Sequence, residues 1–185
     1  MVILENIKNW AWIFILVVSV FVAVLTFLKI KEKKGIRIRF AMMRGIIFFG
    51  IMYLPLIDQP RLSAGIALPI IAVMLLVFGL YLIVRGAREL TKTQLQGITG
   101  VPDRIITTGL YAVIRHPINL GFMFAFLGWY LLWAGTYSLI FPPVLVVILI
   151  FETFWEERKI EKTLGEEYTE YKKRVGMFTP KLRER

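Results

Sequence analysis

Four long stretches without Asp, Glu, Lys or Arg constrain what this 185-residue chain can fold into. They are residues 9–28, 45–57, 62–84 and 116–151, and they contain 20, 13, 23 and 36 residues. A helix needs about 20 predominantly apolar residues to cross the hydrocarbon core of a bilayer. The first and third stretches therefore predict one span each, and the fourth predicts two shorter spans joined by a tight turn near Gly135.

The second stretch, residues 45–57, is short for a span. A helix that begins near Phe40 and carries Arg44 inside the membrane reaches spanning length, and Arg44 then faces a polar cavity or snorkels to the interface. The alternative is a short interfacial or re-entrant helix. We take the full span as the prediction, which makes an all-α, multi-pass membrane protein with about five transmembrane helices.

The basic residues support five spans and predict their orientation. The chain carries 23 Lys and Arg and a net charge of +10, and 21 of these residues lie in alternate connections. Those connections are residues 29–44, 85–115 and the tail after Glu156. The positive-inside rule then predicts the N-terminus outside and the C-terminus in the cytoplasm. Basic residues at a lipid boundary attract anionic headgroups, so the charge argues for the bilayer and against nucleic acid as a partner.

Composition narrows the chemistry further. The chain has no cysteine and one histidine, and 57% of its residues are hydrophobic. Thiolate catalysis, disulfides and cysteine-bound zinc or iron–sulfur clusters are therefore excluded, as is a multi-histidine metal site. We expect no metal.

Beyond the spans, we expect two regions: residues 1–88 with the first three spans, and residues 89–185 with the catalytic parts. The second region begins with a long cytoplasmic connection, residues 89–116. Loops of that length are usually either functional or disordered. This one carries apolar residues, so we expect it to be ordered. The region ends in a segment whose apolar residues form one stripe of an amphipathic helix, and Gly165 is able to divide that segment into two helices. The stripe consists of Ile160, Leu164, Tyr168, Tyr171 and Val175.

One cluster of polar residues stands out at the helix ends. Arg115, His116 and Pro117 begin the fourth span, where free backbone N–H groups favour anions. Glu152 and Glu156 end the fifth span, and a hairpin of these two spans returns both ends to the same membrane face. Each residue has an ordinary interpretation as an interface or solvated side chain. Together they predict a pocket that holds one end of a zwitterion with cations and the other with carboxylates.

At these residues the sequence resembles the superfamily of isoprenylcysteine carboxyl methyltransferases and phospholipid N-methyltransferases. The matching segments cover roughly the last 95 residues, and the first three spans match only as hydrophobic helices. The segments read ITTGLY from Ile106, RHPINLG from Arg115, the acidic pair at Glu156, and GEEYTEY from Gly165.

The resemblance implies an integral membrane methyltransferase with S-adenosylmethionine as cofactor and a lipid or lipidated acceptor. By motif position it implies a cytoplasmic cofactor pocket closed by the C-terminal helix. The implied cofactor residues are Gln96, Asp103, Arg104, Ile105, Ile106, Tyr111, His116, Pro117, Ile118, Asn119 and Glu156.

Two positions depart from the family pattern. Asn119 stands where the family commonly has tyrosine, and Glu152 stands where the carboxyl methyltransferases have a basic residue near the substrate. We expect Arg115 and Glu152 to act as the catalytic residues. A carboxylate at position 152 modestly favours a cationic amine acceptor over a carboxylate acceptor.

Two other functions remain open at the level of the sequence. One is a membrane reductase with a fold like the sterol reductases and NADPH as cofactor, although no separate dinucleotide motif is present. The other is a non-catalytic membrane scaffold or small transporter. The polar residues gather at one membrane face and not at the midplane, which argues against a transporter.

Overall fold

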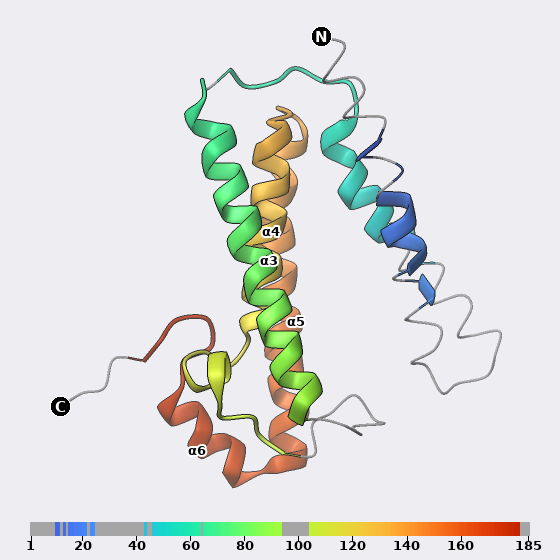
Figure 1. Ribbon diagram of the computed structural model, residues 1–185. Helices are drawn as coiled ribbons and strands as arrows, with labels where there is room; N and C mark the ends of the chain where they lie inside the picture. The colour runs from blue at the N-terminus through green and yellow to red at the C-terminus, as the bar shows by residue number, and fades with distance from the viewer. Residues whose placement is uncertain are drawn as a thin grey trace. The chain divides into compact units, whose positions relative to one another are not determined.

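Figure 1 shows a computed structural model of the chain. It describes residues 10–24 apart from 12, 14 and 22, residue 43, and residues 46–63, 65–93 and 104–181. Gln96 and Asp103, both predicted to bind cofactor, lie outside the described residues, as does nearly all of the basic segment 29–44. The chain divides into two units, and each is described by itself. They are Met1–Leu62 with Trp133–Ser138, and Ser63–Leu132 with Leu139–Arg185.

Every regular element among the described residues is a helix, which confirms the predicted all-α class. Residues 15–21 and 46–53 are helical and precede the labelled helices. The α-helices that follow are α3 (Ala67–Thr93), α4 (Pro117–Trp133), α5 (Phe141–Leu164) and α6 (Glu166–Arg174). The short 3₁₀ helices are η1 (Leu54–Leu56), η2 (Gly109–Ala112) and η3 (Ser138–Ile140).

Two helices are long and apolar enough to cross a membrane. They are Ala67–Leu90, with 24 residues, and Ser138–Leu164, with 27, and only 17% of the most apolar window of each is buried. The core helix of a soluble protein would be mostly buried, so these exposed apolar faces favour lipid as their surroundings. Helix α4 has 17 residues and Ile46–Leu56 is also shorter, so the count of five spans stays a prediction.

Prolines and one strained turn position the helix ends around the predicted hairpin. Pro117 begins α4, and a proline lies at the first turn of α5, where its missing N–H is no loss. Helix α4 ends at Trp133, and Ala134 follows with a φ of 48°. The turn therefore lies near Gly135, as the sequence predicts.

Glycines bring α3 and α4 into close contact. A Cβ added to Gly79 would lie 2.5 Å from the carbonyl oxygen of Gly121 and from the amide nitrogen of Ala125. One added to Gly128 would lie 2.6 Å from the carbonyl oxygen of Ala72. Small residues allow helix backbones to approach this closely, which is a common way of packing helices in membranes.

Helices α4 and α5 are joined through a buried threonine. Asn119 Nδ2 donates a hydrogen bond to Thr153 Oγ1 at 2.9 Å, and this hydroxyl in turn donates to the Leu149 carbonyl at 2.7 Å. Thr153 has no exposed surface. Because a buried hydroxyl is costly without partners, these two bonds fix the rotation of α5 beside the start of α4.

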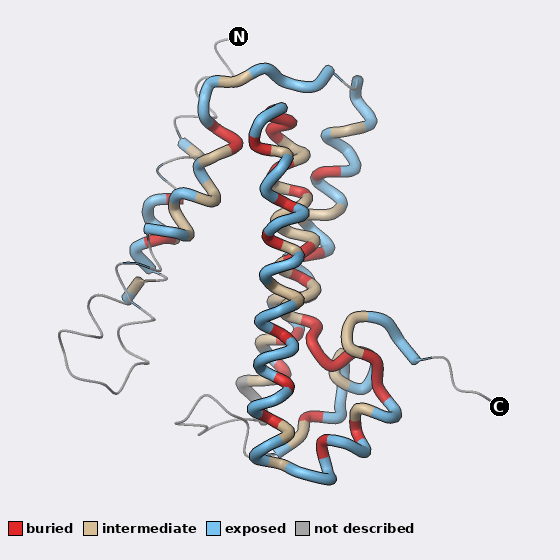
Figure 2. Tube along the Cα trace, turned by 180° about the vertical axis from the view of Figure 1, so that it is seen from behind, coloured by how far each residue is buried: buried red, intermediate tan, exposed pale blue. Residues whose placement is uncertain are grey.

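Helix α6 packs back against the end of α5. Gly165 lies between the two helices with a φ of 56°, a left-handed conformation that favours glycine. The small core that results is visible as the red stretches of α6 in Figure 2. It consists of Ile160, Tyr168, Tyr171 and Val175, with Ile105 and Leu164 packed against it.

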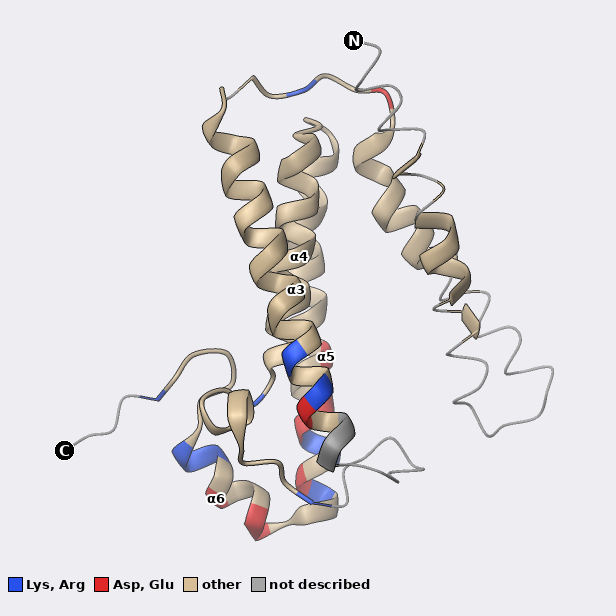
Figure 3. Ribbon diagram, viewed as in Figure 1, with Lys and Arg blue, Asp and Glu red and all other residues tan. Residues whose placement is uncertain are grey.

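Charged side chains of this second unit gather at the end that carries α6 (Figure 3). Residues 67–84 of α3, all of α4 and residues 141–151 of α5 contain none. Helix α6 has two acidic residues in its first turn and three basic residues in its last, which suits the helix dipole. The polar end of the helices is therefore the place to look for a site.

In the first unit, Gln59 fastens residues 57–62 to the hairpin turn. Its Oε1 accepts hydrogen bonds from the backbone N–H groups of Tyr137 and Ser138, both at 3.0 Å, and its Nε2 donates to the Leu54 carbonyl at 3.1 Å. Leu62 N donates to the Ala134 carbonyl at 2.9 Å. One side chain thus bonds to three backbone groups, and it is the acceptor for the N–H groups of Tyr137 and Ser138.

Candidate functional site

A cavity of about 210 Å³ opens where α3, α4, α5 and α6 converge at the charged end. Its wall comes from three parts of the chain that are distant in sequence: Leu90, residues 104–119 and residues 156–171. The lining residues are Leu90, Arg104, Ile105, Ile106, Tyr111, Arg115, His116, Ile118, Asn119, Glu156, Ile160, Leu164, Tyr168 and Tyr171. The lining combines apolar side chains with hydrogen-bonding groups.

The segment before α4 is held in place by a carboxylate from α3. Glu89 Oε2 accepts a hydrogen bond from the Leu110 N–H at 2.8 Å, and Glu89 Oε1 pairs with Arg85 Nε at 3.2 Å. Gly109 has a φ of 58°, and a Cβ there would collide with the Glu89 carboxylate. Position 109 therefore requires glycine for two reasons: its φ is positive, and the Glu89 carboxylate leaves no room for a Cβ.

The entry to α4 is paired with the segment that follows α6. Arg115 N donates to the Gly176 carbonyl at 2.9 Å, and His116 N donates to the Met177 carbonyl at 3.2 Å. Ile114 and Gly176 form an isolated parallel bridge. These bonds place residues 114–116 beside residues 176–177 and bring α6 over the cavity.

Arg115 and Glu157 form a buried ion pair beneath the cavity. Arg115 Nε and Nη2 each lie 2.7 Å from Glu157 Oε1, and the two side chains are 7% and 5% exposed. Arg115 Nη1 donates to the Val175 carbonyl and, at 3.4 Å, to the Lys172 carbonyl. All three guanidinium nitrogens therefore have protein partners.

His116 lies between the two glutamates of the acidic pair. Its Nε2 is 3.1 Å from Glu157 Oε1, and its Nδ1 is 3.7 Å from Glu156 Oε2. Glu156 is half exposed and also accepts from Asn119 Nδ2 at 3.5 Å. Glu156 thus faces the cavity with one weak partner, whereas Glu157 is engaged from several sides.

Tyrosines complete the wall on the α6 side. Tyr171 donates its hydroxyl to the Tyr111 carbonyl at 2.6 Å, which joins α6 to η2. Burial raises the pKa of Tyr171 to about 12, and it also raises the pKa of Tyr111 and of Tyr168. The phenols keep their protons at neutral pH, so they serve as hydrogen-bond donors and not as bases.

Most of the predicted site residues within the described part of the chain are brought together here. Pro117 is buried and begins α4 at the edge of the cavity. The residues that line the cavity as predicted are Arg104, Ile105, Ile106, Tyr111, Arg115, His116, Ile118, Asn119 and Glu156.

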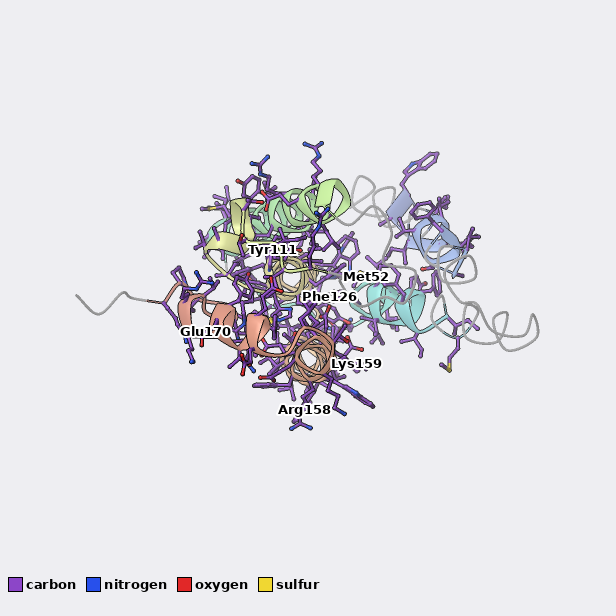
Figure 4. The ribbon with its side chains drawn as sticks, turned by 90° about the horizontal axis from the view of Figure 1, so that it is seen from below. Met52, Tyr111, Phe126, Arg158, Lys159 and Glu170 are labelled. Atoms are coloured by element: carbon purple, nitrogen blue, oxygen red, sulfur yellow. The ribbon has the colours of Figure 1, made fainter. Side chains whose placement is uncertain are left out.

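Glu152 is the described residue that the structure does not bring to the cavity. It lies in a separate hollow along the outer face of α5, with Phe151, Trp155 and Arg158 among its neighbours. Figure 4 shows Arg158 on the side of α5 away from Tyr111. Glu152 is one turn before Glu156, so it lies about 6 Å further along α5, and a rotation of about 40° moves it toward Trp155.

Several residues of the site were not predicted. Glu89 and Glu157 carry hydrogen bonds that shape it, and Leu90 lines it from α3. The amphipathic stripe of Ile160, Leu164, Tyr168 and Tyr171 was a signal for a packed helix, and it contributes to the cavity as well as to the core. The Glu89 contact spans 21 residues and the Glu157 contact spans 42, and no local pattern indicates such pairs.

The pattern of the phospholipid methyltransferase family matches residues 68–167. This range exceeds half of the chain and includes α3, η2, α4 and α5. The chain belongs to the phospholipid methyltransferase family. The predicted membership of this membrane methyltransferase superfamily is confirmed.

Curated relatives within this family carry out methyl transfer to different acceptors, according to their names. The methanethiol S-methyltransferase 1 of Bradyrhizobium diazoefficiens is 33% identical over 129 residues, which are 67% of this chain and 44% of that protein. The methanethiol S-methyltransferase of Pseudomonas deceptionensis is 35% identical over 74 residues, 40% of this chain and 28% of that protein.

A third relative is the protein-S-isoprenylcysteine O-methyltransferase of Saccharomyces cerevisiae. It is 35% identical over 86 residues, 41% of this chain and 32% of that protein. The chain spans less than half the length of each of these three relatives. No solved structure matches the chain.

Proposed function

We propose that this phospholipid methyltransferase family member is an integral membrane enzyme that uses S-adenosylmethionine to methylate a small or lipid-borne acceptor. The observation that supports the proposal is the overlap of family pattern and cavity. Of the 14 residues that line the cavity, all but Tyr168 and Tyr171 lie within the matched residues 68–167. A cavity formed by the family region is the best candidate for the family's chemistry.

The donor set of the cavity fits S-adenosylmethionine. Ile105, Ile106 and Leu164 supply an apolar wall for a flat base, and Glu156 is a carboxylate for an ammonium or a ribose hydroxyl. The free N–H groups at the start of α4 suit a carboxylate. When bound, S-adenosylmethionine supplies an electrophilic methyl group on a sulfonium centre.

The chain's own residues then position the reactants. Methyl transfer requires the attacking atom, the methyl carbon and the departing sulfur in line, and holding that geometry accounts for much of the rate. Glu156, His116 and Asn119 fix the polar end, while Tyr111 and Tyr168 narrow the wall and exclude water. None of these residues needs to accept a proton from a thiolate acceptor.

The geometry bears on the class of acceptor. Arg115 makes hydrogen bonds to Glu157 and to two carbonyls, so its guanidinium is already engaged and is not available to a carboxylate acceptor. Glu152 lies outside the cavity, so it gives no support to the expected preference for an amine. A thiolate, which has given its proton to water before the transfer, needs neither group. We therefore favour a thiol acceptor, in keeping with the names of the methanethiol relatives.

The proposed setting is the one that the charge pattern predicts. Five spans place the N-terminus outside and the site on the cytoplasmic side of the membrane. The charged end of α3, α4 and α5 then lies at the headgroups, and the cofactor arrives from the cytoplasm. An apolar acceptor reaches the same place from the bilayer.

A methyl-labelled assay tests the proposal. Detergent-purified protein is incubated with labelled S-adenosylmethionine and one of three acceptors: a short alkyl thiol, a prenylated cysteine with a free carboxylate, or phosphatidylethanolamine. We expect label in the thiol, and a strong loss of transfer in Glu156→Gln. Glu170→Gln is the matched control, because Glu170 is exposed on α6 and bonds only to neighbouring residues.

The outcomes separate the alternatives. Label in the prenylated carboxylate alone contradicts the acceptor class but leaves methyl transfer intact. Absence of label in all three acceptors, together with no binding of S-adenosylmethionine, contradicts methyl transfer and returns the reductase and the scaffold to consideration.

A further inference from the structure

The charges beneath the cavity determine what the cavity wall presents. Glu157 is 3% exposed, and its Oε1 receives both Arg115 Nε and Arg115 Nη2 at 2.7 Å. Lys172 Nζ from α6 lies 3.6 Å from Glu157 Oε2. Arg115 lines the cavity, but its guanidinium is engaged by Glu157 and by the Lys172 and Val175 carbonyls. Glu156, which is half exposed, presents a carboxylate to the cavity.

The same Glu157 oxygen also orients the histidine ring. Nε2 of His116 is 3.1 Å from Glu157 Oε1, and an ionised carboxylate only accepts hydrogen bonds. The proton on the ring must therefore lie on Nε2. In a neutral imidazole this leaves Nδ1 with a lone pair.

Nδ1 lies on the Glu156 side of the ring. Its distance to Glu156 Oε2 is 3.7 Å, which is too long for a direct hydrogen bond between the two atoms. At this distance Nδ1 and Oε2 are able to accept hydrogen bonds from the same donor group of a ligand. The ring of Phe178 lies on another side, with its centroid 6.3 Å from that of His116. The residues around the ring thus fix its plane.

We propose that Glu157 is a positioning residue: it holds the Nε2 proton of His116 so that Nδ1 and Glu156 together accept hydrogen bonds from one cationic or hydroxyl group of the cofactor. This inference rests on the proposed function for the identity of the ligand. It assigns His116 the role of an acceptor, where the sequence predicted a cation that holds one end of a zwitterion. Glu157 touches no ligand and acts through the ring.

The chain offers a direct spectroscopic test, because His116 is its only histidine. The protein is produced with imidazole nitrogens labelled with ¹⁵N and with an affinity tag that contains no histidine. The nitrogen shifts distinguish a ring nitrogen that carries a proton from one that carries a lone pair. Near neutral pH we expect a protonated Nε2 and a lone pair on Nδ1 in the wild type.

Substitutions on α5 provide the comparison. Glu157→Leu removes the acceptor that faces Nε2, and we expect a mixture of the two tautomers and about a tenfold loss of S-adenosylmethionine affinity, the equivalent of one hydrogen bond. Glu161→Leu is the matched control. Glu161 lies one turn further on the same helix and contacts Lys172 at 3.3 Å, so its removal leaves the histidine signal unchanged.

The wild-type spectrum alone can overturn the inference, even if Glu157→Leu does not fold. A ring that is protonated on both nitrogens, or on Nδ1 only, contradicts it. An unchanged tautomer in a folded Glu157→Leu also contradicts it. These readings do not depend on catalysis, so the failure of the methyl-transfer proposal is seen separately in the labelled-methyl assay.

Discussion

Glu89 accepts the backbone N–H of Leu110 at 2.8 Å, and this bond joins the end of α3 to the turn that precedes Tyr111. The two residues are 21 positions apart. The carboxylate occupies the space next to Gly109 where any other residue would have its Cβ. The position of one wall of the cavity thus depends on a glycine and on a carboxylate from another helix.

Gly109→Ala should therefore destabilise the protein more than Gly165→Ala. Both glycines have a positive φ, 58° and 56°, and strain of that kind costs about 1–3 kcal/mol for another residue. Only Gly109 faces a side chain, since nothing lies within 4 Å of a Cβ at Gly165. Thermal unfolding in detergent measures the difference. Equal losses in the two variants would show that the Glu89 contact has no effect on stability.

The glycine contact between α3 and α4 makes a second prediction. Gly121→Ala should destabilise by about 1–3 kcal/mol, the usual cost of overpacking, because the new Cβ would lie 2.7 Å from the Gly79 carbonyl oxygen. Gly50→Ala is the control, with open space around its Cβ. In that helix alanine should be neutral or stabilising by up to about 1 kcal/mol. A Gly121→Ala protein as stable as the wild type would contradict the close packing.

The buried ion pair predicts a non-additive pair of substitutions. Arg115→Met leaves the Glu157 carboxylate buried with fewer compensating charges, and losing one partner of such a pair costs about 3–5 kcal/mol. Adding Glu157→Gln to Arg115→Met removes that charge and should recover part of the loss. Unfolding free energies of the wild type, the two single variants and the double variant form the cycle. Additive losses would mean that the two side chains do not interact.

Gln59 allows the hairpin turn to be tested apart from the cavity. Gln59→Ala removes the acceptor of the Tyr137 and Ser138 N–H groups. Ser138 is buried, and a buried donor left without a partner costs about 1–3 kcal/mol. Cofactor affinity should stay the same, since Gln59 lines no part of the cavity. Thermal unfolding and titration calorimetry measure the two quantities. A large loss of affinity with unchanged stability would contradict this separation.

Local patterns predicted the helices better than their ends. The charge-free residues 62–84 correctly indicated a helix, yet α3 continues to Thr93. The hydropathy of the sequence indicates which residues lie in the hydrocarbon core of the membrane. The helix itself continues beyond those residues, as long as its charged side chains contact water or oppositely charged partners. Arg85 and Glu89 do so by pairing with each other at 3.2 Å. The helical structure of the C-terminal segment, from Ile160 to Val175, could be predicted because its apolar residues recur with the period of a helix.

The site was predictable where a motif places consecutive residues on one wall, as with Ile105, Ile106 and the run from His116 to Asn119. It was not predictable where a contact depends on how helices rotate against each other. Arg115 lines the cavity, but its hydrogen bond to Glu157, 42 residues away, follows from no local pattern. Glu152 was expected beside Glu156, but the helix turns it toward the outer face of α5.

The most direct measurement is the binding of S-adenosylmethionine to the detergent-purified protein by isothermal titration calorimetry, with Glu156→Gln and Glu170→Gln beside the wild type. We predict saturable binding by the wild type and by Glu170→Gln, and affinity about tenfold weaker or more in Glu156→Gln, because a charged hydrogen bond at the cavity wall is lost. No binding by the wild type, or equal binding by Glu156→Gln, would contradict the assignment of this cavity as the cofactor site.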